Sequence, residues 1–429
     1  MHKRLTLICL AAVYNLGCAQ DVNAQSLVIS NARIIDANGG LIERGSVVVR
    51  DGLIVSVSAG AANVAGAQEI DAAGRTVMPG LIDAHRHVIQ GAPDQWMANE
   101  AARNMQEFLD AGFTTILSAG DSAQHILELR RRLAAGEISG PRLVAAGRVP
   151  LAAGPGGFRP GVDPARLDQS RGPNRQTEAA QAIPHEETRA AVQALAEAGF
   201  DRVKTVIVVT PGGPEVETLT IVAEEARRHG MPSITHAVTV DDTMGAVEAK
   251  TDVLVHTPHI GHLSEEQIRT IVDSGIPMMS TLGVFVPTFA VDNKMIRDRT
   301  GDDNLPRFRD LDPFPMGTLL SAGQGPVNAR LLWEAGIVYG YGTDTRFLPR
   351  DSLAHELKPL RLMFSAQDIV QMLTKNASIT VGLSDEIGTL EPGKLADIVI
   401  VNGDPLADID AVLDVAVVLK SGSIVVDKR

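Results

Sequence analysis

The chain has 429 residues, of which 45% are hydrophobic and 3% aromatic, and its formal net charge at pH 7 is −13. A chain of this length and hydrophobic content can bury one large core and a smaller one, which excludes a disordered or fibrous protein. The acidic balance and the scarcity of aromatic residues argue against a nucleic-acid binder, which needs clustered Lys and Arg for phosphates and aromatic rings for base stacking.

Residues 1–24 are typical of an export signal. A charged start, His2 to Arg4, precedes an apolar stretch from Leu5 to Tyr14 and a small-residue cleavage site that ends at Ala24. We therefore expect an exported protein, periplasmic or secreted, whose mature chain begins near Gln25.

The two cysteines, Cys9 and Cys18, both lie inside this segment. Cleavage after Ala24 would leave no cysteine, which excludes thiol catalysis, disulfides and Cys-ligated zinc in the mature protein. A lipoprotein signal ending at Cys18 is the alternative, although Asn15 stands where an aliphatic residue is usual. No other apolar run reaches the roughly 18 residues that a membrane span needs.

Short β-type segments broken by turn residues fill residues 25–78. Examples are Ser46-Val-Val-Val and Leu53-Ile-Val-Ser-Val, which Asp51-Gly52 separates. Residues 388–429 have the same texture. Because isolated hairpins are only marginally stable in water, we expect the two ends to pair into one composite β-sandwich domain.

Residues 79–387 alternate between helical and strand patterns. Apolar periodicity and Gly/Pro breaks indicate eight strands, around residues 78–87, 114–118, 142–147, 202–208, 232–236, 253–256, 277–281 and 337–342. Helices are expected between most of them, at Asn99–Leu109, Ala123–Ala134, His185–Ala198, Glu215–His229 and Glu265–Val272. This pattern predicts a (β/α)8 TIM-like barrel of the α/β class. A doubly wound open sheet is the alternative, but its first strand would end in a Gly-rich phosphate loop.

Two connections, Gly147–Ile183 and Leu282–Pro326, are too long to be simple turns. In a barrel both would follow strand C-termini and overhang the active-site mouth. The first is rich in arginine: it has Arg148, Arg159, Arg166, Arg171 and Arg175 against the acids Asp163, Asp168 and Glu178. This excess of positive charge would suit an anionic substrate. It is equally consistent with a solvated loop that has no role in binding.

Metal-competent side chains end five of the eight strands. His85 and His87 are two apart, so in an extended strand both imidazoles can face one ion. Lys204 lies in an apolar strand, where its charge is costly unless it is paired or modified. The other three are His236, His256 and Asp344. Strand C-termini share one face of a parallel barrel, so we expect all six groups to converge.

This order of ligands resembles the amidohydrolase superfamily over nearly the whole mature chain. The motifs that carry the resemblance are Pro79-Gly-Leu-Ile-Asp-Ala-His-Arg-His, Ala111-Gly-Phe-Thr-Thr, Tyr341-Gly-Thr-Asp-Thr, His355-Glu-Leu and Ile387-Gly-Thr-Leu-Glu-Pro-Gly-Lys-Leu-Ala-Asp-Ile-Val. Within the superfamily the chain looks most like the imidazolonepropionase-related group, which contains metal-dependent Xaa-Pro dipeptidases, carboxypeptidases and other N-acyl amino-acid hydrolases.

The resemblance implies a site with two divalent metal ions, expected to be zinc, bridged by a CO2-derived carbamate on Lys204. On this basis the first ion would be held by His85, His87 and Asp344, and the second by His236 and His256. Two such ions lower the pKa of a bridging water enough to supply hydroxide near neutral pH. Asp344 would take the proton of that water and pass it to the leaving nitrogen.

Substrate contacts transfer less well from the family. Many relatives have a Gly-Gly-His in the third-strand loop, where this chain has Phe158. Arg346, two residues after Asp344, is expected to hold a substrate carboxylate, and pairing with Asp351 or Glu356 is the structural alternative. His259 could equally line the pocket or lie on the surface.

The expected reaction is hydrolysis of an amide bond in small N-acyl amino acids or dipeptides. Hydrolysis of lactones, esters or cyclic amides on the same fold is an alternative, as is deamination, although mononuclear deaminases generally lack the lysine that Lys204 provides. A binding protein that has lost its metals is disfavoured, because all six candidate ligands are present. The sequence leaves open whether the chain forms a homo-oligomer.

Overall fold

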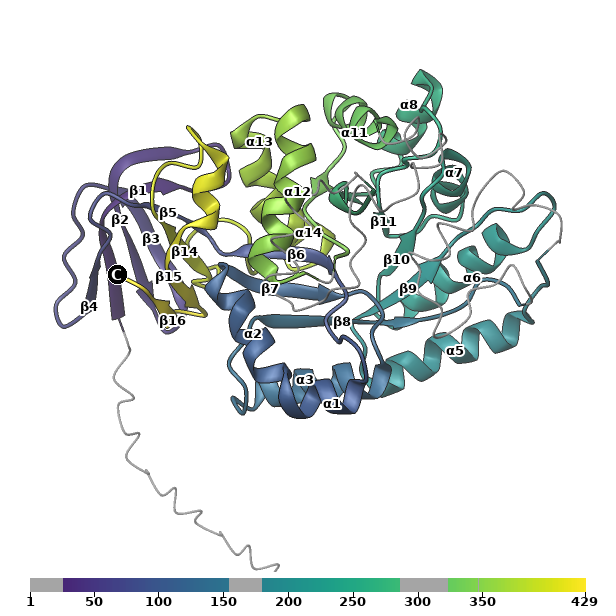
Figure 1. Cartoon of the computed structure of the whole chain (residues 1–429), viewed down its shortest axis with the longest axis horizontal. Coiled ribbons are helices and arrows are strands. Elements are labelled where there is room, and N and C mark those ends of the chain that lie inside the picture. Colours follow the sequence, from purple (N-terminus) through teal and green to yellow (C-terminus); the bar gives the residue numbers. More distant parts are fainter. Residues whose placement is uncertain (1–25, 154–179, 286–322, 346) are drawn as a thin grey trace, which may run out of the picture.

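The computed structural model describes residues 26–153, 180–285, 323–345 and 347–429. The expected export signal, most of both long connections and the predicted substrate residue Arg346 lie outside these residues. Figure 1 shows two β-sheet bodies side by side, one built from both ends of the chain and one from its middle.

The first sheet joins the two ends of the chain. Its N-terminal strands are β1 (Ser26–Ile35), β2 (Leu41–Arg50), β3 (Leu53–Ala59), β4 (Gln68–Asp71) and β5 (Thr76–Pro79), and its C-terminal strands are β14 (Ile398–Val401), β15 (Val415–Lys420) and β16 (Ser423–Asp427). The strand order is β16-β15-β14-β5-β1-β2-β3. The antiparallel pairing of β5 with β14, in which Val77 lies opposite Ile400, brings the purple and yellow strands of Figure 1 together. The two chain ends therefore pair with each other, as the sequence predicts, and they do so within one sheet.

This sheet branches at β1, whose first half pairs with β4 and whose second half pairs with β5. Residues from both chain ends pack into one hydrophobic core, in which Ile29, Val47, Val77 and Ile398 are fully buried. Because neither end could bury these side chains alone, each end stabilises the other.

The second sheet is a barrel of eight parallel strands. They are β6 (Leu81–Arg86), β7 (Phe113–Ser118), β8 (Arg142–Arg148), β9 (Arg202–Val206), β10 (Ser233–His236), β11 (Val253–Val255), β12 (Met278–Met279) and β13 (Tyr339–Gly340). Each strand pairs with its neighbours in chain order. Every strand that the sequence predicts overlaps an observed one, and the expected α/β fold with a TIM-like barrel is confirmed.

Backbone hydrogen bonds between β6 and the chain around β13 close the barrel. The Ala84 N–H donates to the Tyr341 carbonyl over 3.1 Å, and the Asp344 N–H donates to the His85 carbonyl over 2.8 Å. Gly342 permits this approach, because a Cβ at that position would lie 2.9 Å from the His85 Cβ. The glycine of the Tyr341-Gly-Thr-Asp motif therefore fixes His85 and Asp344 as neighbours.

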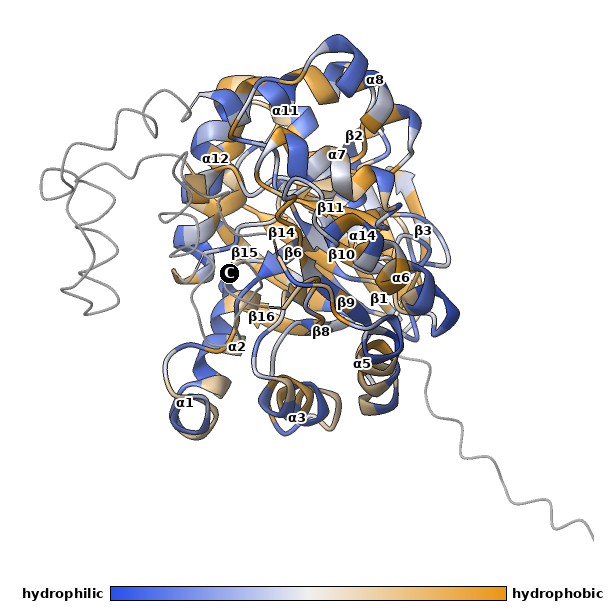
Figure 2. Cartoon of the chain, turned by 90° about the vertical axis from the view of Figure 1, so that its right-hand side faces the viewer, coloured by the Kyte–Doolittle hydropathy of each residue, from blue (hydrophilic) through white to orange (hydrophobic). Residues whose placement is uncertain are grey.

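Helices surround the barrel strands. Their bounds are α1 (Pro93–Asn99), α2 (Ala101–Asp110), α3 (Ala123–Ala134), α5 (His185–Ala198), α6 (Glu215–Arg228), α7 (Val240–Glu248), α8 (Glu265–Asp273), α11 (Gln324–Glu334), α12 (Pro349–Met363), α13 (Ala366–Gln371) and α14 (Ala377–Thr380), with short turns η1 (Gly283–Phe285), η2 (Met372–Asn376) and η3 (Ile409–Leu413). In Figure 2 the central strands are largely hydrophobic, whereas outlying helices such as α1 and α8 include many hydrophilic residues.

Local sequence explains where several of these helices begin and end. Ser264 starts α8 with a capping box, in which its side chain and that of Gln267 each accept a backbone hydrogen bond. Helix α5 ends at Gly199, which takes a left-handed conformation with φ 85°. Within the described ranges, no helix combines the length and the apolar character that crossing a membrane requires.

Candidate metal centre

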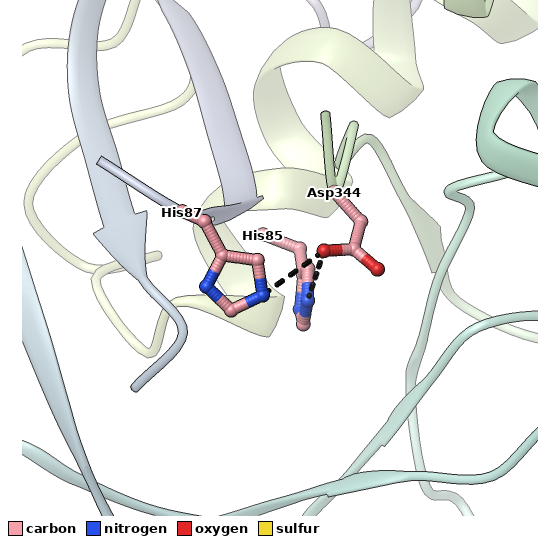
Figure 3. Close-up of side chains that lie close together, drawn as sticks. All are labelled: His85, His87 and Asp344. Carbon is pink, nitrogen blue, oxygen red and sulfur yellow. Dashed lines mark ion pairs between the residues drawn. The ribbon is translucent and has the colours of Figure 1, made fainter. Parts of the chain in front are cut away.

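His85, His87 and Asp344 converge at the C-terminal end of the barrel (Figure 3). His85 lies in β6, His87 follows that strand directly, and Asp344 follows β13. The Asp344 Oδ1 lies 3.1 Å from the His87 Nε2 and 3.4 Å from the His85 Nε2. One ligand atom from each of the three residues lies within 4.8 Å of the others. Two imidazole nitrogens and a carboxylate oxygen at this spacing are a donor set that suits a divalent ion.

A second pair of histidines adjoins the other oxygen of Asp344. The His256 Nε2 lies 3.7 Å from the Asp344 Oδ2 and 2.6 Å from the His236 Nδ1. The Thr281 hydroxyl, 2.5 Å from the His256 Nδ1, orients the ring. The two oxygens of the Asp344 carboxylate therefore lie near different histidines, Oδ1 near His85 and His87 and Oδ2 near His256.

Lys204 is the sixth residue of the cluster. Its side chain, on β9, is only 4% exposed, and its Nζ has no hydrogen-bond partner among the described residues. Burial lowers the pKa of Lys204 to about 7, although the nearby charge of Asp344 opposes that shift. A buried amine without a partner is costly in free energy, so a modification that gives it partners would be favourable.

Burial and neighbouring charges set the protonation of the cluster. Burial lowers the pKa of His85 to about 3 and holds the pKa of His256 well below its usual value. Burial alone would raise the pKa of Asp344, but the adjacent His85 and His87 outweigh it and hold that pKa well below its usual range. Neutral imidazoles and an ionised carboxylate are the forms that bind metal.

The backbone is strained where these groups are presented. His256, Thr281 and Asp344 have φ values of 75°, 46° and 50°, in the left-handed region that side chains other than glycine rarely adopt. His256 directly follows β11, Thr281 lies two residues after β12, and Asp344 lies four residues after β13. Strain of this kind persists where the surrounding structure enforces it, and it collects at functional sites.

Comparison with known protein families matches residues 76–425 to the amidohydrolase family. This chain belongs to the amidohydrolase family. A 5-methylthioadenosine/S-adenosylhomocysteine deaminase from Symbiobacterium thermophilum is 26% identical, over 89% of this chain and 86% of its own. An imidazolonepropionase from Geobacillus thermodenitrificans is 24% identical, over 90% and 91% of the two chains. The solved structure of a Xaa-Pro dipeptidase with bound methionine superimposes with a TM-score of 0.71 at 21% identity, covering 93% of this chain and 99% of that one.

Sequence reasoning missed a buried arginine beneath the centre of this amidohydrolase. Arg86, between the two histidines, is 2% exposed. Its guanidinium donates to the hydroxyls of Thr345 (2.9 Å) and Ser352 (2.6 Å) and to the Phe347 carbonyl. The buried Asp83 accepts from the Thr343 hydroxyl over 2.7 Å. Together they tie β6 to the chain on either side of Asp344.

Replacement of Arg86 by Met should destabilise this amidohydrolase by about 3–5 kcal/mol, because it removes one charge of a buried polar network and leaves its partners unsatisfied. The free energy of unfolding from urea titration measures the effect. Arg103→Met is the matched control, since Arg103 is exposed and pairs only with Glu100 within the described chain, which should contribute at most about 1 kcal/mol. Equal losses in the two variants would contradict a structural role for the Arg86 network.

The other residues that the sequence singled out are the histidine and arginines expected near the substrate, and the structure describes only some of them. His259 is half-buried beside the cluster. Arg148 ends β8 directly opposite Lys204 in the pairing of β8 with β9. Arg346 and Phe158 lie outside the described residues, so their expected roles stay predictions.

Proposed function

We propose that this amidohydrolase is an exported hydrolase that uses two divalent metal ions, expected to be zinc, to cleave an amide bond in small N-acyl amino acids or dipeptides. The observation that carries the proposal is the joint placement of three close ligand atoms, from His85, His87 and Asp344, with a second histidine pair and a buried lysine amine that has no hydrogen-bond partner among the described residues. Export rests on residues 1–24 of the sequence.

The chain fits a pair of ions better than one. His85 and His87 face one oxygen of Asp344 while His256, beside His236, faces the other. Reaction of the neutral Lys204 amine with CO2 would form a carbamate and release a proton. That product would replace a costly buried amine with two oxygens able to contact an ion on either side.

When bound, two such ions supply a water of lowered pKa and polarise the scissile carbonyl. The chain's own contribution to the reaction centres on Asp344. Its carboxylate is ionised and lies near both His87 and His256, so it can accept a proton from the attacking water. The same group can then donate that proton to the leaving nitrogen, because it returns to its charged form in doing so.

The test is a hydrolysis screen on the purified protein, run together with metal analysis. N-acyl amino acids and dipeptides form the main panel, and lactones and aryl esters form the comparison panel. We expect close to two metal equivalents per chain and faster release of free amino acid than of any alcohol. Cleavage of lactones or esters alone would replace the proposed substrate class, and a metal-free protein without turnover would support a binding role.

Deamination is the second candidate, because the deaminase from Symbiobacterium thermophilum matches 89% of this chain. Ammonia release from 5-methylthioadenosine, followed with a coupled assay, tests it directly. Lys204 speaks against this branch, because mononuclear deaminases of the superfamily that the chain resembles generally lack a lysine at that position. Ammonia release in the absence of amide cleavage would decide for deamination.

A further inference from the structure

The turn η1, which follows β12 at the barrel mouth, is held by two residues of α12 that the proposed reaction does not use. The fully buried Glu356 carboxylate accepts from the backbone N–H groups of Leu282 (2.8 Å) and Gly283 (2.5 Å). His355 Nε2 lies 2.8 Å from the Gly283 carbonyl. A Cβ at Gly283 would lie 2.7 Å from the Glu356 Oε2, so only glycine fits. We call these contacts of Glu356 and His355 the clamp, and they hold the turn in place.

The clamped turn places Phe285 against the candidate metal centre. Its ring stacks on His259, with centroids 3.6 Å apart and planes 19° from parallel. The same ring meets His256 edge-on, with centroids 5.2 Å apart. His259 and Phe285 are both half-buried, and together they form the surface that we call the aromatic wall.

The chemistry of this wall indicates what would lie against it. His256 is itself within 3.7 Å of the Asp344 carboxylate, so a group bonded to the reacting carbonyl or nitrogen would be one side chain away from Phe285. Aromatic faces attract apolar groups, and another ring gains a further stacking or edge contribution. Burial raises the pKa of Glu356 to about 8, which shows that its charged form is disfavoured at this place. Its hydrogen bonds to the backbone of the turn offset part of that unfavourable free energy.

We propose that the aromatic wall of His259 and Phe285 is a specificity-determining surface, which selects substrates with an apolar group, best an aromatic one, next to the scissile bond. The proposal rests on the proposed function for the position of that bond. Glu356 acts through the turn as a positioning residue.

Binding of two small chelators to the zinc-loaded full chain tests the wall without turnover. Benzohydroxamic and acetohydroxamic acids share one metal-binding group and differ in a ring against a methyl group. By calorimetry, wild type should bind the ring-bearing compound more tightly by roughly 10-fold or more, as burial of a phenyl group predicts. Phe285→Ala should bring the two affinities close together, and Phe285→Leu should give an intermediate ratio.

Kinetics on matched substrates give the second readout. The ratio of kcat/KM for N-benzoyl and N-acetyl forms of one amino acid should fall in Phe285→Ala, as should the ratio for phenylalanine and alanine as leaving groups if the ring lies on that side. Leu362→Ala removes an exposed apolar side chain of α12, 78% accessible, and should leave every ratio unchanged.

The outcomes separate the wall from the proposed function. Equal chelator affinities in wild type, or an unchanged ratio in Phe285→Ala, would overturn the wall. A ring preference that Phe285→Ala abolishes, in a protein that cleaves no amide, would support the wall and overturn amide hydrolysis. Rates that fall equally for all substrates in Phe285→Ala, with both chelator affinities equally weakened, would reduce Phe285 to a structural role.

Discussion

Lys204→Ala should abolish turnover and remove at least one of the two expected metal equivalents. In the folded protein the Lys204 side chain is buried among charged groups of the centre, and its amine has no hydrogen-bond partner in the described part of the chain. If the amine is carboxylated, its two oxygens would add to Asp344 a second set of oxygen ligands for the two ions. Alanine at this position would therefore remove these oxygens and leave too few ligands for both ions.

Metal content by mass spectrometry and turnover of the best substrate measure the effect. Addition of a short carboxylic acid, with CO2 excluded, should restore part of the rate, because its two oxygens can occupy the vacated space. Lys250→Ala is the control, since Lys250 is exposed and precedes the N-terminal end of β11, whereas His256 follows the C-terminal end of that strand. A Lys204→Ala variant that keeps two metals and full rate would make Lys204 an ordinary buried lysine.

The barrel could be predicted, and the six candidate ligands could be proposed, because both depend on local patterns. Short apolar runs that each end in a polar group, such as Val253-Leu-Val before His256, define a strand and its C-terminus together. Once the strands are parallel and closed, their ends must meet. The pairing of the two chain ends, in which Val77 lies opposite Ile400, could likewise be predicted in outline, because two β-rich ends would not be stable alone.

The supporting side chains could not be predicted, because their partners are distant in sequence. Arg86 lies between two histidines in the sequence, yet its hydrogen bonds reach Ser352, 266 positions away. Glu356 was expected only as a partner for Arg346, but its carboxylate binds the backbone of Leu282 and Gly283. Such contacts depend on how loops fold over the mouth, which no periodicity in the sequence encodes.

Asp344→Asn should separate metal binding from proton transfer. The asparagine keeps the size of the side chain and a carbonyl oxygen that can face His85 and His87, but it cannot accept a proton at ordinary pH. Metal content should therefore survive better than turnover. Loss of general acid–base help should lower kcat by about 10²-fold or more.

The dependence of kcat on pH distinguishes loss of proton transfer in Asp344→Asn from a loss of folded structure. Because His85 and His87 hold the pKa of Asp344 well below its usual range, wild type should keep this carboxylate ionised throughout the neutral and mildly acidic range. Any rise of kcat with pH in that range then belongs to another group, and it should persist in the residual activity of Asp344→Asn. Asp94→Asn, at an exposed carboxylate, is the control and should match wild type. Turnover near the wild-type rate in Asp344→Asn would exclude Asp344 as the proton carrier and leave it the role of a metal ligand alone.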